Sequence, residues 1–447
     1  MHQPGISGDS SPRQGAVPDV SQPRSMAETG LSELLLTDLL CKHLYDAGSL
    51  DAGKLMQRTG LAGPVLDELI GLMRRDGRLE VLGQAGVRGV GLRYGLTERG
   101  RTVAREAMER NSYLGPAPYP IERYRELLKA QTVHHATVTA PRMHEAFTGL
   151  VVHEVMLDRL GAALNSGRAM MLYGPAGTGK TFIGSKLIRL FDEAIWVPHA
   201  VAINEIVIEI YDPQVHRLIE VDEPEQPNLL LEDGHDRRLL RCKRPVVVTG
   251  GELTMDQLEI RHDAITHRSE APLQLKAGNG IFIIDDLGRQ SMPPAKLLNR
   301  WIVPMEEKKE YLNLGGGRHS ELPFDVILVF STNINPLQLA DEAFLRRIGY
   351  KVYFTYLTRD EYAQIWRQEM EKLGLAFDPE LLQYVLDELH AAEKVPLLPC
   401  HPRDILGMAM DRKRYLGSSG PLVPRDVEWA WRSYFVRVRD FEQGDKS

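Results

Sequence analysis

The sequence predicts an α/β protein with a parallel sheet, followed by an all-helical C-terminal unit. Three observations predict this class. From about residue 147, apolar strands alternate with helices, which is the order of a parallel sheet. One strand leads into a glycine-rich loop and a helix, and two later strands end in polar residues. After Phe354 only helical patterns remain, over residues 360–373, 379–392, 403–416 and 425–439.

The composition is typical of a soluble, multidomain protein inside the cell. The 447 residues include 54 Lys and Arg against 61 Asp and Glu, a net charge of −7, so no global positive field holds nucleic acid. Three widely spaced cysteines predict reduced thiols rather than a disulfide framework or a zinc site. The longest apolar runs have the length of strands, and the start of the chain lacks a signal pattern. We therefore expect a cytoplasmic protein without membrane insertion.

The N-terminal part divides into a tail, a small domain and a linker. Residues 1–30 are rich in Gly, Pro, Ser and Gln, which predicts a disordered tail. Residues 31–111 show the order helix, helix, helix, hairpin, helix, with Thr97 as the N-cap of the last helix. This order is typical of a winged helix-turn-helix domain, and "RYGLTERGR" resembles its return strand. Residues 112–146 are expected to form a linker that contains one basic helix.

The strongest local signal is a phosphate-binding loop, G-x-x-x-x-G-K-T, between an apolar strand (169–173) and a helix (182–191). Its glycines let backbone N–H groups converge on phosphate oxygens. Lys180 is expected to reach the β- and γ-phosphates, and the Thr181 hydroxyl to ligate Mg²⁺. The sequence therefore predicts ATP and Mg²⁺ as cofactors. The expected nucleotide contacts are Gly174, Pro175, Ala176, Gly177, Thr178, Gly179, Lys180, Thr181, Phe182 and Val151.

Two carboxylates follow the buried strand 281–284, where a parallel sheet delivers side chains to its ligand-binding edge. Asp285 is expected to join Thr181 in holding the metal ion, and Asp286 to orient or deprotonate the attacking water. An ordinary strand followed by an Asp-Asp turn is the simpler alternative. Glutamate is the commoner residue at the second position, so the shorter Asp286 leaves the speed of turnover open.

Asn333 follows a third apolar strand, 326–330, and its short polar extension. We expect this strand to lie between the two others, with the Asn333 amide bound to the γ-phosphate or to the attacking water. A strand-end asparagine that is satisfied by local hydrogen bonds is the alternative.

Together these residues resemble an AAA+ ATPase. Asn333 is similar to sensor 1, "DEAFLRRIGYKV" resembles the arginine-finger segment, and "HPRDILGMAMDR" resembles sensor 2. Within AAA+, "FTGLVVHEVMLDRLGAALNSGRAMMLYGPAGTGKT" and "GNGIFIIDDLGRQSMPPAKLLNRWIVPMEE" are similar to the MoxR-like group. The resemblance covers about residues 147–435. It implies a three-layer αβα P-loop core (147–356) and a helical lid (357–447). The long segment between residues 191 and 280 departs from the pattern.

The resemblance also implies roles for three arginines. Arg347 matches the arginine finger, and Arg346 is the second candidate for this role. An arginine finger acts on the γ-phosphoryl group of a nucleotide bound by a neighbouring subunit. The resemblance therefore implies a ring, which we expect to be a hexamer. Arg403 matches the sensor 2 arginine, which couples the lid to the nucleotide. Solvated arginines, and for Arg403 a surface pair with Asp404, are the plainer alternatives.

Two classes of function follow. The first is an ATPase that remodels a protein client in a chaperone-like way, as the MoxR-like resemblance implies. The second is a DNA-associated ATPase or regulator that uses residues 31–111. This segment has 12 Lys and Arg against 11 Asp and Glu, and its expected recognition helix carries Asp67 and Glu68, which disfavours DNA. A slow nucleotide switch is a third option.

Overall fold

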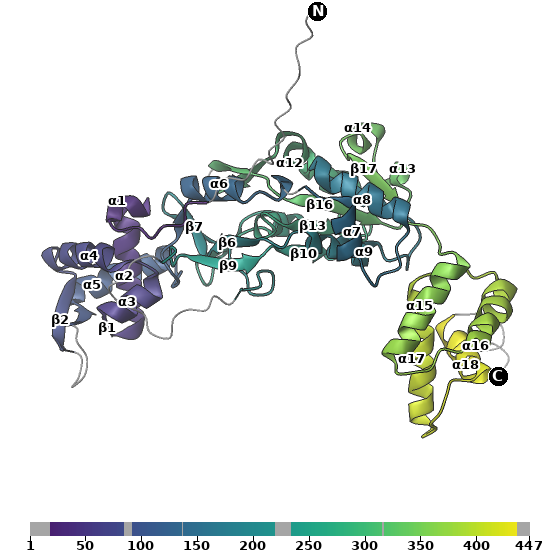
Figure 1. Ribbon diagram of the computed structural model, residues 1–447. Helices are drawn as coiled ribbons and strands as arrows, with labels where there is room; N and C mark the ends of the chain where they lie inside the picture. The colour runs from purple at the N-terminus through teal and green to yellow at the C-terminus, as the bar shows by residue number, and fades with distance from the viewer. Residues whose placement is uncertain (1–17, 85–91, 136, 220–233, 315–316, 436–447) are drawn as a thin grey trace, which may run out of the picture.

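The structure is a computed structural model that describes residues 18–84, 92–135, 137–219, 234–314 and 317–435. The molecule is elongated, with an N-terminal unit at one end, an α/β core in the middle and a helical unit at the other end (Figure 1). Within the described residues, no helix combines the length and the apolar character that a bilayer crossing requires.

The core contains a five-stranded parallel sheet in the order β10-β13-β16-β5-β17. The strands are β5 (Met170–Tyr173), β10 (Val246–Thr249), β13 (Ile281–Ile284), β16 (Ile327–Thr332) and β17 (Tyr350–Tyr353). The predicted parallel sheet is therefore confirmed, and β16 lies between β13 and β5, as expected from the sequence. Because the strands are parallel and in register, the residues that follow β5, β13 and β16 meet at one edge of the sheet.

Helices cover both faces of this sheet, which is why its strands are apolar throughout rather than alternating. On one face, Met170, Ile283 and Val329 pack with α8 (Glu154–Ser166) and α9 (Lys180–Lys186). On the other face, Met171, Phe282 and Phe330 pack with α11 and α12. The bounds of this last pair are Pro294–Arg300 and Ile302–Glu307.

The N-terminal unit contains four helices around a three-stranded sheet of order β1-β3-β2. Its elements are α2 (Glu33–Ala47), β1 (Ser49–Asp51), α3 (Ala52–Thr59), α4 (Gly63–Arg75), β2 (Leu79–Gln84), β3 (Leu92–Leu96) and α5 (Glu98–Arg110). Thr97 caps α5 by accepting a hydrogen bond from the Gly100 backbone N–H, as the sequence predicts. Strand β1 has no counterpart in the prediction; it pairs with β3 and completes the sheet.

A second, mixed β structure joins the N-terminal unit to the core, and we call it the β-arm (residues 112–131, 194–219, 234–245 and 251–276). Its main sheet has the order β11-β12-β8-β7-β4, and β6 pairs separately with β9. The strands are β4 (Tyr119–Pro120), β6 (Ala194–Pro198), β7 (Ala200–Ile203), β8 (Ile206–Glu209), β9 (Leu239–Lys243), β11 (Arg261–Asp263) and β12 (Arg268–Glu270).

The segment predicted as a linker is thus not a free connector. Helix α6 (Ile121–Ala130) buries Ile121, Tyr124, Leu127 and Leu128 in the same apolar cluster as the β-arm strands. These four positions lie on one face of a helix, so the helix has an apolar stripe that must be covered. Helix α7 (Ala140–Ala146) then leads into the core.

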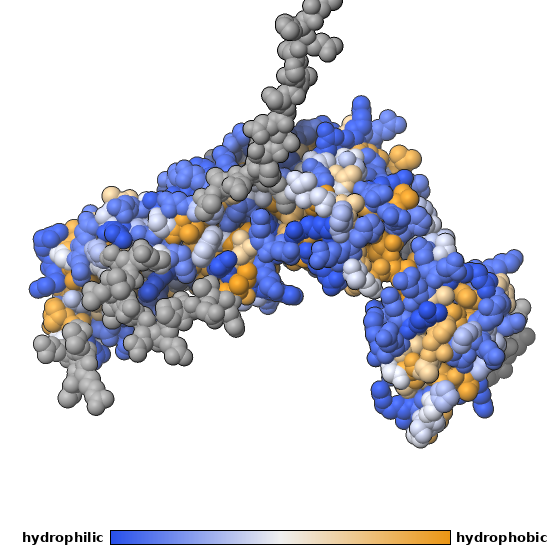
Figure 2. Space-filling view, in the orientation of Figure 1, coloured by the Kyte–Doolittle hydropathy of each residue, from blue (hydrophilic) through white to orange (hydrophobic). Residues whose placement is uncertain are grey.

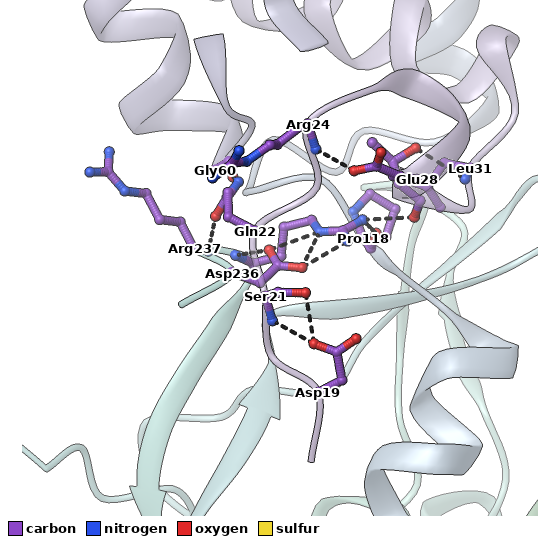
Figure 3. Close-up of polar contacts among 12 residues, drawn as sticks. Asp19, Ser21, Gln22, Arg24, Glu28, Leu31, Gly60, Pro118, Asp236 and Arg237 are labelled. Carbon is purple, nitrogen blue, oxygen red and sulfur yellow. Dashed lines mark hydrogen bonds and ion pairs between the residues drawn. The ribbon is translucent and has the colours of Figure 1, made fainter. Parts of the chain in front are cut away.

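Residues 18–30 also differ from the predicted disordered tail, of which residues 1–17 lie outside the described residues. They cross the joint between the N-terminal unit and the β-arm (Figure 3). The Gln22 side chain donates to the Gly60 carbonyl at 2.9 Å and accepts from the Arg237 backbone N–H at 2.8 Å. The Asp236 N–H donates to the Val20 carbonyl at 2.7 Å. These hydrogen bonds order the segment together with apolar contacts, since Pro23 is buried and Val20 and Met26 pack against neighbouring apolar clusters.

A buried ion pair lies beneath this joint. Arg238 and Asp236 are 0% and 1% exposed, with the Arg238 Nη2 atom 2.8 Å from the Asp236 carboxylate. The Arg238 Nη1 atom also donates to the carbonyl of Thr29 at 3.0 Å. A buried charge must be fully paired to be tolerated, so this arrangement ties Thr29, in the segment that crosses the joint, to the β-arm.

The C-terminal unit is all-helical and lies at the end of the molecule opposite the N-terminal unit (Figure 1). It consists of α15 (Arg359–Lys372), α16 (Pro379–Tyr384), the π-helix η4 (Val385–Ala391), α17 (Cys400–Tyr415) and α18 (Pro424–Tyr434). Trp366 and Trp431 are fully buried at its centre. Much of the visible surface of the molecule is hydrophilic, whereas hydrophobic residues run down the middle of this unit (Figure 2). Helix α17 begins at Cys400, three residues before the predicted start.

Candidate nucleotide site

The glycine-rich loop follows β5 and leads into α9. Gly177 and Gly179 have φ angles of +77° and +83°, in the region that favours glycine. A Cβ atom at Gly174 would lie 2.1 Å from the Phe354 carbonyl oxygen, so the loop can pass beside the end of β17 only without a side chain. These glycines therefore permit a tight loop whose backbone is accessible to phosphate oxygens.

Lys180 is held inside the loop. The residue is only 6% exposed, and its Nζ atom donates to the carbonyls of Gly174 at 2.9 Å and Pro175 at 2.7 Å. Burial lowers the pKa of Lys180, and the nearby carboxylates of Asp285 and Asp286 act in the opposite direction. The ammonium group is thus pre-positioned at the loop, with the two carboxylates that follow β13 close enough to influence it.

The two predicted metal ligands are in direct contact. The Thr181 hydroxyl donates to the Asp285 carboxylate with an Oγ1–Oδ2 distance of 2.6 Å. A hydroxyl and a carboxylate are oxygen ligands of the type that Mg²⁺ takes together with substrate phosphates. The donor set therefore fits a magnesium ion bound between the loop and β13.

Asp286 and Asn333 are also brought together, from β13 and β16. The Asn333 Nδ2 atom donates to the Asp286 Oδ1 atom at 3.0 Å. Asp286 has a φ angle of +47°, a conformation that is sparsely populated by residues other than glycine. This backbone conformation carries the Asp286 carboxylate to the side chain that follows the neighbouring strand.

Gln290 fixes the turn at Asp285 and Asp286 by hydrogen bonds, and the sequence did not predict this role. Its Nε2 atom donates to the backbone carbonyls of Gly250 and Asp285, both at 3.1 Å, and its Oε1 atom accepts from the Gly288 N–H at 2.9 Å. Gln290 therefore ties the Asp-Asp turn to the loop after β10. Its position four residues after Asp286 carries no motif that identifies this role.

Replacing Gln290 by alanine should lower turnover of the nucleotide while leaving its affinity nearly unchanged. The half-buried carbonyls lose their donor, and a displacement of about 1 Å in a reacting group can cost on the order of a hundredfold in rate. Measuring kcat and the nucleotide Kd separately tests this positioning role. A parallel loss of affinity would indicate a general collapse of the loop instead.

Arg347, the predicted arginine finger, lies away from the glycine-rich loop of its own chain. The Arg347 Nε atom donates to the Glu306 carboxylate at 2.6 Å. The two residues line a pocket of about 490 Å³ together with Arg168, Ala169 and Arg346. Ala169 directly precedes β5, whereas Gly174 directly follows it, so the pocket and the glycine loop lie at opposite ends of a strand about 13 Å long.

The remaining predicted contacts are dispersed. Arg403 is 71% exposed and pairs with Asp404 at 2.8 Å, as its plainer alternative anticipated. Phe182 is 50% exposed beside Lys186, and Val151 is half-buried before α8. The C-terminal unit nevertheless reaches the loop, because a Cβ atom at Gly177 would lie 2.9 Å from the Cys400 sulfur atom.

One family model matches part of the chain. A family model described as a domain of unknown function (DUF8689) matches residues 358–433, within the C-terminal unit. No curated protein matches the sequence.

Several solved structures resemble the chain at low sequence identity. NtrX from Brucella abortus is 14% identical with a TM-score of 0.40, over 66% of this chain and 57% of NtrX. NtrX in complex with ADP is 14% identical with a TM-score of 0.39, over 74% of this chain and 65% of NtrX. A mutant of RuvB from Thermotoga maritima is 12% identical with a TM-score of 0.36, over 63% of this chain and 69% of RuvB. The chain thus spans less than two thirds of the length of NtrX.

Proposed function

We propose that the protein is an AAA+ ATPase that hydrolyses ATP at the edge of its parallel sheet. The observation that carries the proposal is the convergence of three strands. The loop after β5 meets Asp285 through Thr181, and Asp286 meets Asn333 at the same edge. Phosphoryl transfer requires phosphate binding, a metal ligand and a group that positions water, and the residue types at this edge support assigning all three roles here.

Each residue has a defined role in this proposal. The loop backbone and Lys180 bind the phosphates, and Thr181 and Asp285 hold Mg²⁺. When bound, the metal ion neutralises the charge that develops on the phosphoryl oxygens. Asp286 accepts a hydrogen bond from the attacking water and takes its proton, and Asn333 keeps the Asp286 carboxylate oriented.

We further propose that the site is completed by a neighbouring subunit in a ring. Arg347 lies at the opposite end of β5 from the glycine loop, which supports a role on another subunit's nucleotide rather than on its own. Glu306 holds the guanidinium in the isolated chain. A head-to-tail interface generates a ring when its rotation closes, and we propose a closed ring of six subunits.

For the biological role, we propose conformational work on a protein client, with residues 31–111 as a winged-helix domain and residues 357–447 as the lid. Helix α1 (Met26–Thr29) lies on the expected recognition helix α4, where the Met26 N–H donates to the Glu68 carboxylate at 3.0 Å. This contact occupies part of the surface that would enter a DNA groove. It favours a protein-binding role for this domain over the alternative of a DNA-associated regulator.

Replacing Lys180 by alanine should weaken ATP binding by about 10- to 100-fold, because charged hydrogen bonds to phosphate are worth about 1.5–3 kcal/mol each. Binding of a fluorescent ATP analogue, with and without Mg²⁺, measures this directly. Lys186→Ala is the matched control, since Lys186 lies on the same helix over the Phe182 ring and should leave binding unchanged. Equal affinity of the Lys180→Ala variant and the unmodified protein would contradict the proposed site.

A further inference from the structure

The β-arm presents a cationic sheet face that the proposed ATPase does not use. Strand β9 pairs with β6, so Arg241 lies directly opposite Trp196. Residues 217–219 pair with the other edge of β9, through the hydrogen bonds from the Lys243 N–H to the Arg217 carbonyl and from the Ile219 N–H to the Arg241 carbonyl. Opposite residues of an antiparallel pair share a face, so Arg217, Lys243 and Arg241 project from the same side.

At residues 241–243 this side faces away from the core of the β-arm, whereas Leu239, at the start of β9, is buried and Trp196 packs against the apolar cluster. Ile195, Val197 and Cys242 point inward and are buried in its apolar cluster. Arg217, Arg241 and Lys243 are exposed. We call these three cations, with Trp196, the strand face.

The cations of the strand face differ from the other basic residues of the β-arm. Most of those have carboxylate partners, in the pairs Arg238–Asp236, Arg244–Glu193, Arg261–Glu270, Arg268–Glu209 and Lys276–Asp212. Among the residues that the structure describes, no carboxylate pairs with Arg217, Arg241 or Lys243. Three like charges on adjacent strands repel one another, so the strand face gains electrostatically from an external polyanion.

An aromatic pair lies within this charged face. The Trp196 and His235 rings are 4.7 Å apart between centroids and inclined by 39°. Trp196 is half-buried between the apolar cluster and the His235 ring, so part of the residue remains exposed on this face. A flat aromatic surface beside a row of cations matches a ligand that offers both anionic groups and planar rings.

We propose that the strand face binds single-stranded nucleic acid, with Arg217, Arg241 and Lys243 on phosphates and a base stacked on Trp196. Single strands expose both groups at once, whereas paired bases in a duplex are not free to stack on a protein ring. An acidic peptide would satisfy the cations but would leave the Trp196–His235 pair without a role. The proposal concerns a site apart from the glycine loop and does not depend on ATP hydrolysis.

The test is fluorescence anisotropy of the full chain with a labelled oligothymidylate of about 20 nucleotides, longer than the roughly 4–16 nucleotides that one compact strand-binding domain occupies. Three phosphate contacts predict a slope of about −2 for log K against log salt concentration, because each contributes about −0.7 in a single strand. The Arg241→Ala/Lys243→Ala double variant should reduce this slope by about 1.4. Trp196→Ala should weaken binding on the order of tenfold, and Trp196→Phe, which keeps a stacking ring, should restore most of it.

Matched controls separate this proposal from its rivals. Arg74→Ala/Arg75→Ala, on the expected recognition helix, should leave oligonucleotide binding unchanged, and the strand-face variants should retain ATP binding and hydrolysis. Absence of binding at low salt would overturn the proposal. So would a loss of binding confined to the Arg74/Arg75 variant, or an equal affinity for poly-glutamate and for the oligonucleotide.

Discussion

Replacing Asp286 by asparagine should abolish steady-state ATP hydrolysis while leaving ATP binding intact. Asparagine keeps the shape of the side chain but cannot take a proton from water, and the loss of a general base typically costs about 10²–10⁴ in rate. The glycine loop, Lys180 and the Thr181–Asp285 pair are untouched by this change. Phosphate release under saturating ATP measures the rate, and a fluorescent nucleotide measures the affinity.

Asp286→Glu is the informative control for this prediction. It retains the carboxylate and extends it by one methylene toward the water, so hydrolysis should persist. The left-handed backbone at residue 286 is less favourable for glutamate than for aspartate, so the variant should also be somewhat less stable. Turnover of Asp286→Asn at the unmodified rate would remove Asp286 from the mechanism and favour a different base.

Replacing Arg347 by alanine should reduce hydrolysis by about 10³-fold or more, with ATP binding retained. An arginine finger stabilises charge that develops only in the transition state, so its removal affects kcat rather than affinity. The variant also leaves Glu306 without its partner, but both side chains are partly exposed and the cost in stability should be small. Hydrolysis and sedimentation measured on the same sample separate catalytic loss from loss of assembly.

Arg346→Ala is the matched control, because it removes the same charge one residue away in the same pocket. Arg346 is exposed and its Nε atom donates only to the Glu342 carbonyl, at 3.4 Å, among the hydrogen bonds of the described residues. We expect this variant to retain most of its activity. If Arg346→Ala were inactive and Arg347→Ala active, the two arginines would exchange roles and the proposed finger would be wrong.

The sequence predicts the candidate site better than it predicts the surroundings of that site. Asp285, Asp286 and Asn333 could be placed because they lie within two residues of the ends of short apolar strands, and parallel strands bring their carboxyl ends to one edge. The order of the strands adds that β16 separates β13 from β5. The hydrogen bond between Asn333 and Asp286 is then expected, because the two residues follow neighbouring strands.

The supporting contacts could not be predicted in the same way, because they join residues that are distant in sequence and carry no motif. Glu306 meets Arg347 across 41 residues, and Gln290 reaches the Gly250 carbonyl across 40. The β-arm was missed for a related reason. Its strands are short, several pair with strands far away in sequence, as β4 does with β7 and β6 with β9, and β4 lies in the segment whose composition predicts a linker. Such pairings are decided by tertiary packing rather than by local pattern.

The central claim is that a nucleotide bound by one subunit is hydrolysed with the arginine of the next, and mixing two inactive variants tests it most directly. Lys180→Ala subunits lack a phosphate site but carry Arg347, whereas Arg347→Ala subunits bind ATP but lack the finger. Mixed in equal amounts, they should regain roughly one quarter of the unmodified rate, since random assembly places the required neighbours at one interface in four. A mixture no more active than its separate components, although it assembles, would contradict the account.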